Sequence, residues 1–349
     1  MTRVLVTGHD GYIGSVMAPA LLDAGHDVVG LDTGYFRQCT LVPRGVQHPA
    51  VRKDIRDLGS ADLHGFDAVV HLAALSNDPI GNLNEAWTAE INYLASVRLA
   101  TLAREAGVER FLFSSSCIMY GTSEAAVVDE RAPLDPKTEY ARSKVRAEQA
   151  ISELADDSFS PTFLRNGTVY GLSPRMRFDT VFNDLIGSAV STGRVVVHGD
   201  GSPWRPVVHL EDLVRAFTAV LEAPRGKVHD EAFNTGTEAL NHRVGELATI
   251  AVGAVPGCEL EVLGEPSADR RTYRADFGKF GRAFPDFEFR WTPADGAWEL
   301  RDALVSIGLT QDTFADSRFT RLKWLRHLLE TGQVDGSLRW SAERASAAR

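Results

Sequence analysis

The chain of 349 residues is poor in cysteine, lacks long apolar runs and has no excess of positive charge. Its three cysteines, Cys39, Cys117 and Cys258, form neither a CxxC pair nor a paired framework. This pattern predicts a reducing compartment and no cysteine-based metal site. No apolar stretch could span a bilayer, and the first residues enter an expected strand instead of a signal peptide. We therefore expect a cytoplasmic protein without a membrane partner.

The formal net charge of −10 argues against an extended surface for nucleic acid. It still leaves room for a local basic pocket that binds a phosphorylated metabolite. His198, His209 and His242 lack metal-ligand spacing, and the chain has no GxSxG elbow. The sequence thus predicts neither a metal site nor a serine hydrolase.

The first half of the chain alternates short β-rich runs with segments of helical periodicity. Near-continuous apolar strands between helices predict an α/β fold with a doubly wound, Rossmann-type parallel sheet. The longest helices are expected at about 83–106 and 138–155. Strands are expected at 3–7, 27–32, 67–73, 110–116 and 161–166.

The alternation weakens from about residue 172, which predicts a smaller α+β lobe over a ligand cleft. We expect a dinucleotide-binding domain over 1–172 with a return segment near 205–235. The substrate-binding lobe is then expected over 173–204 and 236–305, and a helical extension over 306–349.

A glycine-rich turn, TGHDGYIG (7–14), follows the first expected strand and opens a helix. Its glycines allow a tight turn and a close approach to a pyrophosphate, while the helix N-terminus supplies N–H donors. Asp32 ends the second strand, where an acidic side chain binds the ribose 2′-hydroxyl and favours NAD over NADP. Arg37 lies close enough in sequence to weaken this preference. The turn residues expected to bind the cofactor are Gly8, Asp10, Gly11, Tyr12, Ile13 and Gly14.

Tyr140 and Lys144 stand four residues apart, so a helix places both on one face. A nearby ammonium stabilises a phenolate and moves the phenol pKa toward neutral pH. Tyr140 is therefore a candidate acid/base and Lys144 the residue that tunes it. The alternative is an ordinary surface pair on a solvated helix.

These motifs together resemble the extended short-chain dehydrogenase/reductases, and within them the NAD-dependent nucleotide-sugar epimerase/dehydratase family. The resemblance covers roughly residues 1–300. The motifs that carry it are TGHDGYIG, Asp32, HLAA (71–74), FSSSCIMYG (113–121), YARSK (140–144) and GDGSPWRPVVHLEDLVRA (199–216).

The resemblance implies a catalytic set of Ser116, Tyr140 and Lys144. Tyr140 would take the proton of a sugar hydroxyl while hydride passes to the nicotinamide, and Ser116 would bond the same oxygen. Lys144 would also hold the nicotinamide ribose. Further implied contacts to the cofactor are Asp54, Ile55, Leu72, Ala73 and Ala74. The family also implies a homodimer through the two long helices.

On the substrate side, the resemblance places Arg205 on the pyrophosphate of a nucleotide-diphosphate sugar, a task suited to a guanidinium fork. Its alternative is a surface ion pair. Thr168 stands where relatives usually carry asparagine, and Asp269 retains only part of a later signature, so the nucleotide base stays open. Asn166 is a further candidate contact. Ser76 and Asn77 should face the sugar from the loop after the fourth strand, unless they only form a turn.

Cys117 and Ile118 limit the choice of reaction, because they stand where 4,6-dehydratases typically carry an Asp-Glu pair. Ile118 can carry no proton, which favours a 4-epimerase acting through a transient keto sugar. A dehydratase that uses Cys117 as acid or base, a 4-ketoreductase and a non-enzymatic dinucleotide sensor are the alternatives.

The segment 318–332, RFTRLKWLRHLLETG, carries apolar residues at helical spacing with basic residues between them. We expect a helix packed on its own domain. A contact with a partner protein is the alternative.

Overall fold

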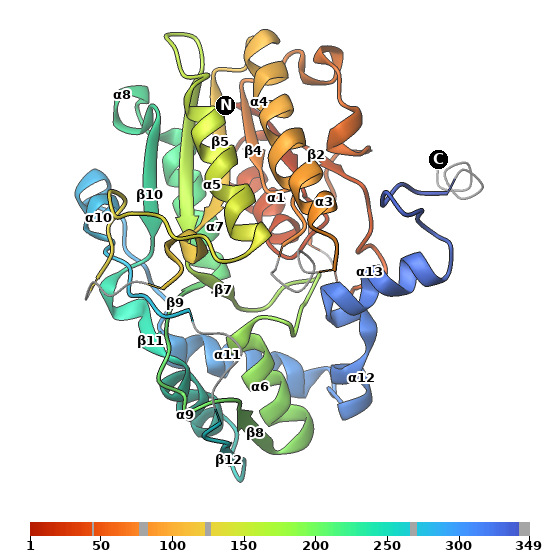
Figure 1. The fold of residues 1–349 in the computed structure, drawn as a ribbon, viewed down its shortest axis with the longest axis vertical. Coiled ribbons are helices and arrows are strands. Elements are labelled where there is room, and N and C mark those ends of the chain that lie inside the picture. The colour runs from red at the N-terminus through yellow and green to blue at the C-terminus, as the bar shows by residue number, and fades with distance from the viewer. Residues whose placement is uncertain (44, 77–82, 123–126, 266–270, 342–349) are drawn as a thin grey trace.

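A parallel seven-stranded sheet lies at the centre of the larger lobe (Figure 1). The computed structural model describes residues 1–43, 45–76, 83–122, 127–265 and 271–341. The strand order is β10-β6-β5-β4-β1-β2-β3, so the direction of winding reverses beside β1. This is the Rossmann-type arrangement expected from the sequence. The strands are β1 (Arg3–Thr7), β2 (Asp27–Asp32), β3 (Ala50–Arg52), β4 (Ala68–His71), β5 (Arg110–Ser116), β6 (Ser160–Asn166) and β10 (Glu231–Thr235).

Alternate residues of the central strands enter two separate apolar cores, one on each face of the sheet. Val4 and Val6 belong to one core and Leu5 to the other. Helix α1 (Gly14–Asp23) packs on α7 (Leu210–Glu222) over the first face. Helix α4 (Ala95–Glu105) packs with α5 (Glu139–Ser152) over the second. Both faces are covered, as parallel sheets require.

The helix expected at 83–106 is interrupted by a wider turn. It consists of α3 (Glu85–Thr88), a π-helical segment (Ala89–Leu94) and α4. Within the π-helical segment, the Asn92 amide accepts from the Leu75 N–H at 2.8 Å and donates to the Leu75 carbonyl at 2.9 Å. The wide turn therefore fixes the loop that follows β4.

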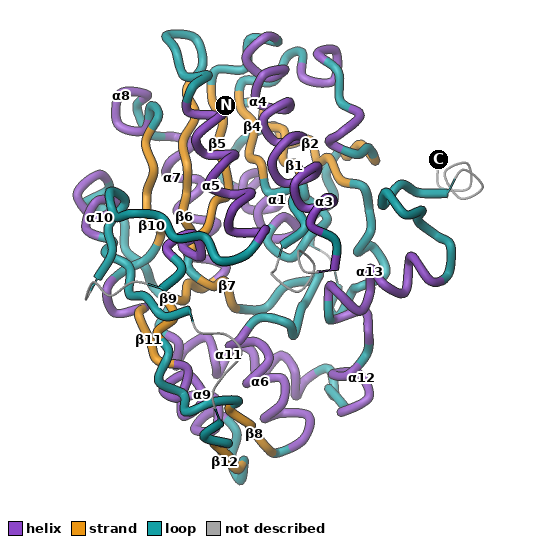
Figure 2. The backbone as a smooth tube through the Cα atoms, in the orientation of Figure 1, coloured by secondary structure: helices purple, strands orange, loops and turns teal. Residues whose placement is uncertain are grey.

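A smaller lobe of mixed α and β structure lies below the sheet in the view of Figure 2. Its helices α6 (Val181–Thr192), α9 (Val244–Ala254) and α11 (Pro293–Ser306) pack on one another. One sheet joins β7 (Thr168–Tyr170), β9 (Trp204–His209) and β11 (Asn241–Arg243), and a second pairs β8 (Arg194–Val197) with β12 (Glu259–Val262). Short helices are η1 (Ile55–Asp57), η4 (Cys117–Tyr120), α8 (Arg225–Val228) and α10 (Gly278–Ala283). The exact domain boundaries stay a prediction.

The C-terminal extension returns to the larger lobe (Figure 1). It contains α12 (Gln311–Ala315), a 3₁₀ turn (Ser317–Phe319) and α13 (Arg321–Glu330). The apolar face of α13 is buried in the second core of the larger lobe, through Trp324, Leu325 and Leu328. In the described part of the chain, no helix is long and apolar enough to cross a membrane.

Candidate active site

A cavity of about 590 Å³ lies at the carboxyl ends of β1, β2, β4 and β5, and residues of both lobes line it. Ligands of doubly wound sheets bind at this edge, where the strand order reverses. The glycine-rich turn, Asp32 and the Tyr-Lys pair all line this one cavity. The topology therefore brings together motifs that are far apart in the sequence, such as Gly8 and Tyr140.

The glycine-rich turn packs tightly against the loop after β4. Gly8 has a φ of +75°, and a Cβ there would lie 2.7 Å from the backbone nitrogen of Ala73. A Cβ on Gly14 would lie 2.1 Å from the carbonyl oxygen of Gly8. Only glycine fits at either position, and α1 starts directly after the turn. Gly11, Tyr12 and Ile13 complete this wall, which has the cradle shape that a dinucleotide pyrophosphate requires.

Asp32 lines the cavity at the end of β2, but Asp10 does not belong to the lining residues described. The Asp32 carboxylate accepts from the backbone N–H of Gly34 at 2.7 Å and of Asp10 at 3.2 Å. The Asp10 side chain instead forms a buried ion pair with Arg175 at 2.7 Å. Asp10 thus contacts Asp32 through its backbone, while its side chain is turned to Arg175. The other candidate cofactor contacts on the cavity wall are Asp54, Ile55, Leu72, Ala73 and Ala74.

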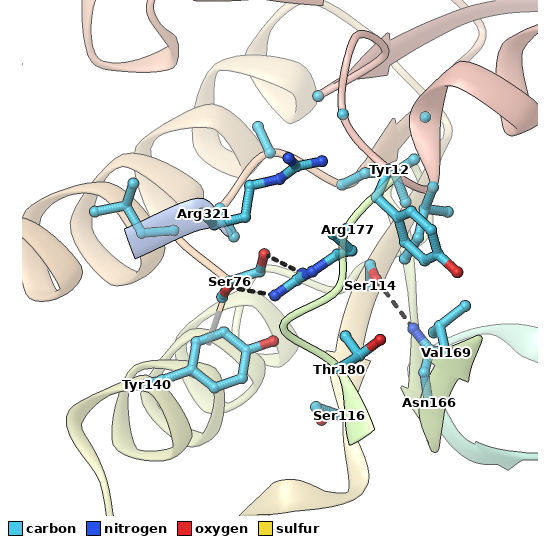
Figure 3. A pocket seen from close by; sticks show the side chains of 18 of the residues that line it. Tyr12, Ser76, Ser114, Ser116, Tyr140, Asn166, Val169, Arg177, Thr180 and Arg321 are labelled. Carbon is cyan, nitrogen blue, oxygen red and sulfur yellow. Dashed lines mark hydrogen bonds between the residues drawn. The ribbon is translucent and has the colours of Figure 1, made fainter. Parts of the chain in front are cut away.

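Tyr140 and Lys144 occupy the first two turns of α5, and Ser116 ends the neighbouring β5. The Lys144 ammonium lies 5.9 Å from the centre of the Tyr140 ring and donates to the Ser114 carbonyl at 2.7 Å. The Ser116 hydroxyl oxygen accepts from the Ile118 N–H at 3.3 Å. Figure 3 shows Tyr140 and Ser116 beside each other on the cavity wall. Phenol, hydroxyl and ammonium can thus act on one ligand.

The Lys144 ammonium is buried, and its burial lowers its pKa to about 8. His71 lies beneath it, where burial and the Lys144 charge lower the imidazole pKa to about 3. The neutral ring bonds the Thr7 hydroxyl at 2.6 Å and the Ser96 hydroxyl at 2.8 Å. A neutral histidine avoids a second positive charge next to Lys144.

The Cys117 thiol lies outside the set of described residues that line the cavity. It is fully buried and donates to the Arg165 carbonyl, with 3.1 Å between sulfur and oxygen. Burial raises the thiol pKa well above its usual range, because the thiolate would be desolvated. Its neighbour Ile118 does line the cavity. The structure therefore brings Ile118, and not Cys117, to the reaction space.

Four of the candidate substrate contacts, Ser76, Asn166, Thr168 and Arg205, line the cavity. The Asn166 amide donates to the Ser114 hydroxyl at 3.0 Å, and Arg205 donates to the Trp204 carbonyl at 2.8 Å. Asn77 and Asp269 lie outside the described residues, so their roles stay predictions.

Two buried arginines of the cavity wall were not expected from the sequence. Arg177 donates to the Ser76 hydroxyl at 3.0 Å (Figure 3). It also pairs with Asp179 at 2.6 Å. Arg321 enters from α13, far along the chain. Arg177 stands in an irregular segment, and Arg321 has the spacing of a polar residue on an amphipathic helix, so no local pattern separates them from surface arginines.

The model of the NAD dependent epimerase/dehydratase family matches residues 4–236. The chain belongs to this family, which is of the extended short-chain dehydrogenase/reductase type. It is therefore an enzyme whose cofactor is NAD. The resemblance drawn from the motifs is confirmed.

Among curated relatives, the UDP-glucose 4-epimerase of Mycolicibacterium smegmatis is 32% identical over 265 residues, covering 72% of this chain and 82% of that protein. The dTDP-D-glucose 4,6-dehydratase of Homo sapiens is 28% identical over 246 residues, covering 67% of this chain and 69% of that protein. A solved structure of MoeE5 with UDP-glucuronic acid and NAD is similar over 87% of this chain and 99% of that one, with a TM-score of 0.76 and 27% identity.

Proposed function

We propose that this protein is an NAD-dependent nucleotide-sugar 4-epimerase. The observation that supports it is the placement of Ser116, Tyr140 and Lys144 on the same cavity as the glycine-rich turn. The identity to the mycobacterial 4-epimerase supports the same activity.

The residues present fit the dinucleotide. The backbone of Gly8, Gly11 and Gly14 would hold its pyrophosphate, and Asp32 the hydroxyls of the adenosine ribose. Lys144 would hold the nicotinamide ribose. When bound, NAD supplies a nicotinamide that accepts a hydride from C4 of the sugar and later gives it back.

Tyr140 is the acid/base of the proposed mechanism. Its phenolate oxygen takes the proton of the sugar C4 hydroxyl, and the Lys144 charge stabilises the phenolate before the transfer. The Ser116 hydroxyl donates a hydrogen bond to the same sugar oxygen. The 4-keto sugar then rotates so that its other face is turned toward the nicotinamide side of the site. Tyr140 returns the proton to the C4 oxygen, and the C4 configuration is inverted.

Ile118 and Cys117 argue against the 4,6-dehydratase alternative. Elimination of water needs groups that carry protons beside C5 and C6, and the Ile118 side chain on the cavity wall carries none. The Cys117 thiol is buried behind the wall with a raised pKa, so it is a poor acid or base. A 4-ketoreductase would use the same three catalytic residues, so only the fate of the hydride distinguishes it.

A nucleotide-diphosphate sugar is the substrate class that we infer. Arg177 and Arg205 both line the cavity, and a guanidinium group suits a pyrophosphate. The solved structure of MoeE5 holds UDP-glucuronic acid, which supports this class for a similar fold.

The test is to incubate the purified protein with a panel of nucleotide sugars in deuterated water and to follow the products by NMR. We expect inversion at C4 without deuterium from the solvent. Loss of water with solvent deuterium at C5 or C6 would contradict the proposal and indicate a dehydratase. No turnover across the panel would also contradict the proposed epimerase activity.

The matching variant is Tyr140→Phe, which keeps the ring and removes the hydroxyl. We expect kcat to fall by about 100- to 10,000-fold, the range for loss of a general acid/base. Tyr93→Phe on the π-helical segment is the control, because Tyr93 is outside the described lining of the cavity. Full activity of Tyr140→Phe would contradict the mechanism.

A further inference from the structure

The C-terminal extension is fastened to the loop that follows β2. The Trp324 indole donates to the Tyr35 carbonyl at 2.7 Å, and the Trp340 indole donates to the Thr33 carbonyl at 2.8 Å. Thr33 and Tyr35 line the cavity next to Asp32. The extension thus fixes the end of the cavity where the adenosine is expected.

A second group of contacts joins the extension to η1. Arg56 donates to the Ser337 carbonyl at 2.8 Å and pairs with the Asp54 carboxylate at 2.7 Å. Arg339 pairs with Asp54 at 3.4 Å and also with Asp57. Asp54 lines the cavity, as Thr33 and Tyr35 do. Residues near the C-terminus therefore contact two parts of the cavity wall at this end.

Arg321, the first residue of α13, reaches the cavity itself. Its side chain donates to the Arg175 carbonyl at 2.6 Å and lies 4.4 Å above the centre of the Phe36 ring. The residue is only 3% exposed, yet it belongs to the cavity lining. Figure 3 shows Arg321 and Tyr12 of the glycine-rich turn in the upper part of the view, with Arg321 entering from the left and Tyr12 from the right.

The charges around Arg321 favour an anion in this part of the cavity. Arg177 is a second buried cation nearby, and burial together with Arg177 lowers the Arg321 pKa to about 10. The Asp179 carboxylate accepts from Arg177 at 2.6 Å and from the Arg321 backbone N–H at 2.9 Å. The Asp179 carboxylate thus pairs with the Arg177 guanidinium, whereas the Arg321 guanidinium donates to the Arg175 carbonyl, and a phosphate would offset its charge.

We propose that Arg321 binds the pyrophosphate of NAD, opposite the glycine-rich turn, and that the C-terminal extension is therefore part of the cofactor site. The guanidinium fork matches phosphate oxygens, and the Phe36 ring and the Arg175 carbonyl orient it. The inference rests on the proposed use of this cavity by NAD and does not depend on which sugar reaction follows.

The test compares Arg321→Met with Arg318→Met in the full-length chain. Arg318 belongs to the same extension, pairs with Asp316 and has a side chain that is 43% exposed. After removal of any bound nucleotide, dissociation constants are measured for NAD, ADP-ribose, adenosine and UDP. For Arg321→Met we expect NAD and ADP-ribose to bind about 10- to 100-fold more weakly, with adenosine and UDP unchanged. Arg318→Met should leave all four constants unchanged.

Three results would overturn the proposal. These are unchanged NAD affinity, an equal loss for adenosine, which would indicate a structural role, and a loss for UDP alone, which would place Arg321 on the substrate. If Arg321→Met does not fold, Arg321→Lys keeps the charge without the fork and should show a smaller loss confined to NAD and ADP-ribose. Because the readout is binding, an inactive protein with these affinities would refute the epimerase and not this inference.

Discussion

Lys144 is a buried cation, and the catalytic position proposed for it lowers the stability of the folded chain. Its pKa of about 8 in the folded protein lies below the ordinary value of 10.5 because the surroundings desolvate the charge. At pH 7 Lys144 is charged in both states, and this charge is better solvated in the unfolded chain than in the folded one. A shift of this size corresponds to about 3 kcal/mol.

We predict that Lys144→Met raises the free energy of unfolding at pH 7 by up to about 3 kcal/mol and abolishes turnover. Between pH 8 and pH 10.5, Lys144 is protonated in the unfolded wild-type chain but mostly neutral in the folded one. The free energy of unfolding of the wild type therefore rises with pH in this range. The difference in the free energy of unfolding between Lys144→Met and the wild type should thus be largest below pH 8 and should vanish near pH 10.5. Urea unfolding of both proteins across this range measures it, and a constant difference would contradict the assignment.

At the level of single residues, the sequence predicts those that belong to motifs with a fixed chemical purpose. Ser116, Tyr140 and Lys144 follow from the spacing and the resemblance, and the structure places them on one cavity. Arg177 and Arg321 could not be predicted, because their importance comes from burial beside each other and not from neighbours in sequence. Cys117 was ambiguous for the same reason, since only the fold decides which side of a strand end faces the ligand.

Among the elements, α5 is joined to the sheet by a buried ion pair. Arg165 on β6 and Glu148 on α5 approach to 2.7 Å, and their side chains are 8% and 7% exposed. Arg165 also donates to the Tyr120 hydroxyl at 3.0 Å. This pair holds the helix that carries Tyr140 and Lys144.

We predict that Arg165→Met lowers the free energy of unfolding by about 3–5 kcal/mol, because it leaves the Glu148 carboxylate buried without its partner. Arg104→Met, which removes a half-exposed pair with Asp156, should lower it far less, because solvent screens that pair. Chemical denaturation of both variants checks the contrast. Equal losses would show that burial does not govern these pairs.

The strands were predictable where an apolar run is buried on both faces. β1, β2 and β5 have the bounds expected, and β4 and β6 differ by a few residues at their ends. β3 was missed because its three residues are all exposed and show no apolar pattern. The sequence did not predict the π-helical segment, because its contact of Asn92 with Leu75 is tertiary and leaves no periodic pattern.

At the scale of the whole molecule, the change in sequence pattern near residue 172 predicts the two lobes. The sequence does not predict where the C-terminal extension packs. The contact of Trp340 with Thr33 joins residues that are 307 positions apart. The amphipathic spacing predicted the helix at 318–332, but a periodic pattern contains no information on which distant surface it covers.

The homodimer stays a prediction. It can be tested by a substitution on the long helices through which the two copies are expected to meet. Leu94 is 57% exposed at the C-terminal end of the π-helical segment, on the helix through which we expect the two copies to meet. Leu94→Glu should shift the protein toward monomer in light scattering after size exclusion. Val305→Glu on α11, 58% exposed, is the control and should leave the mass unchanged. A wild type that is monomeric at micromolar concentration would contradict the prediction.

The central claim is that the hydride removed from C4 returns to C4 of the same sugar. UDP-glucose that carries deuterium at C4 tests this directly, because NMR of the product shows where the deuterium lies. The account predicts an inverted C4 that retains the deuterium. Deuterium at C6 with loss of water, or an inverted C4 that has lost its deuterium, would contradict it.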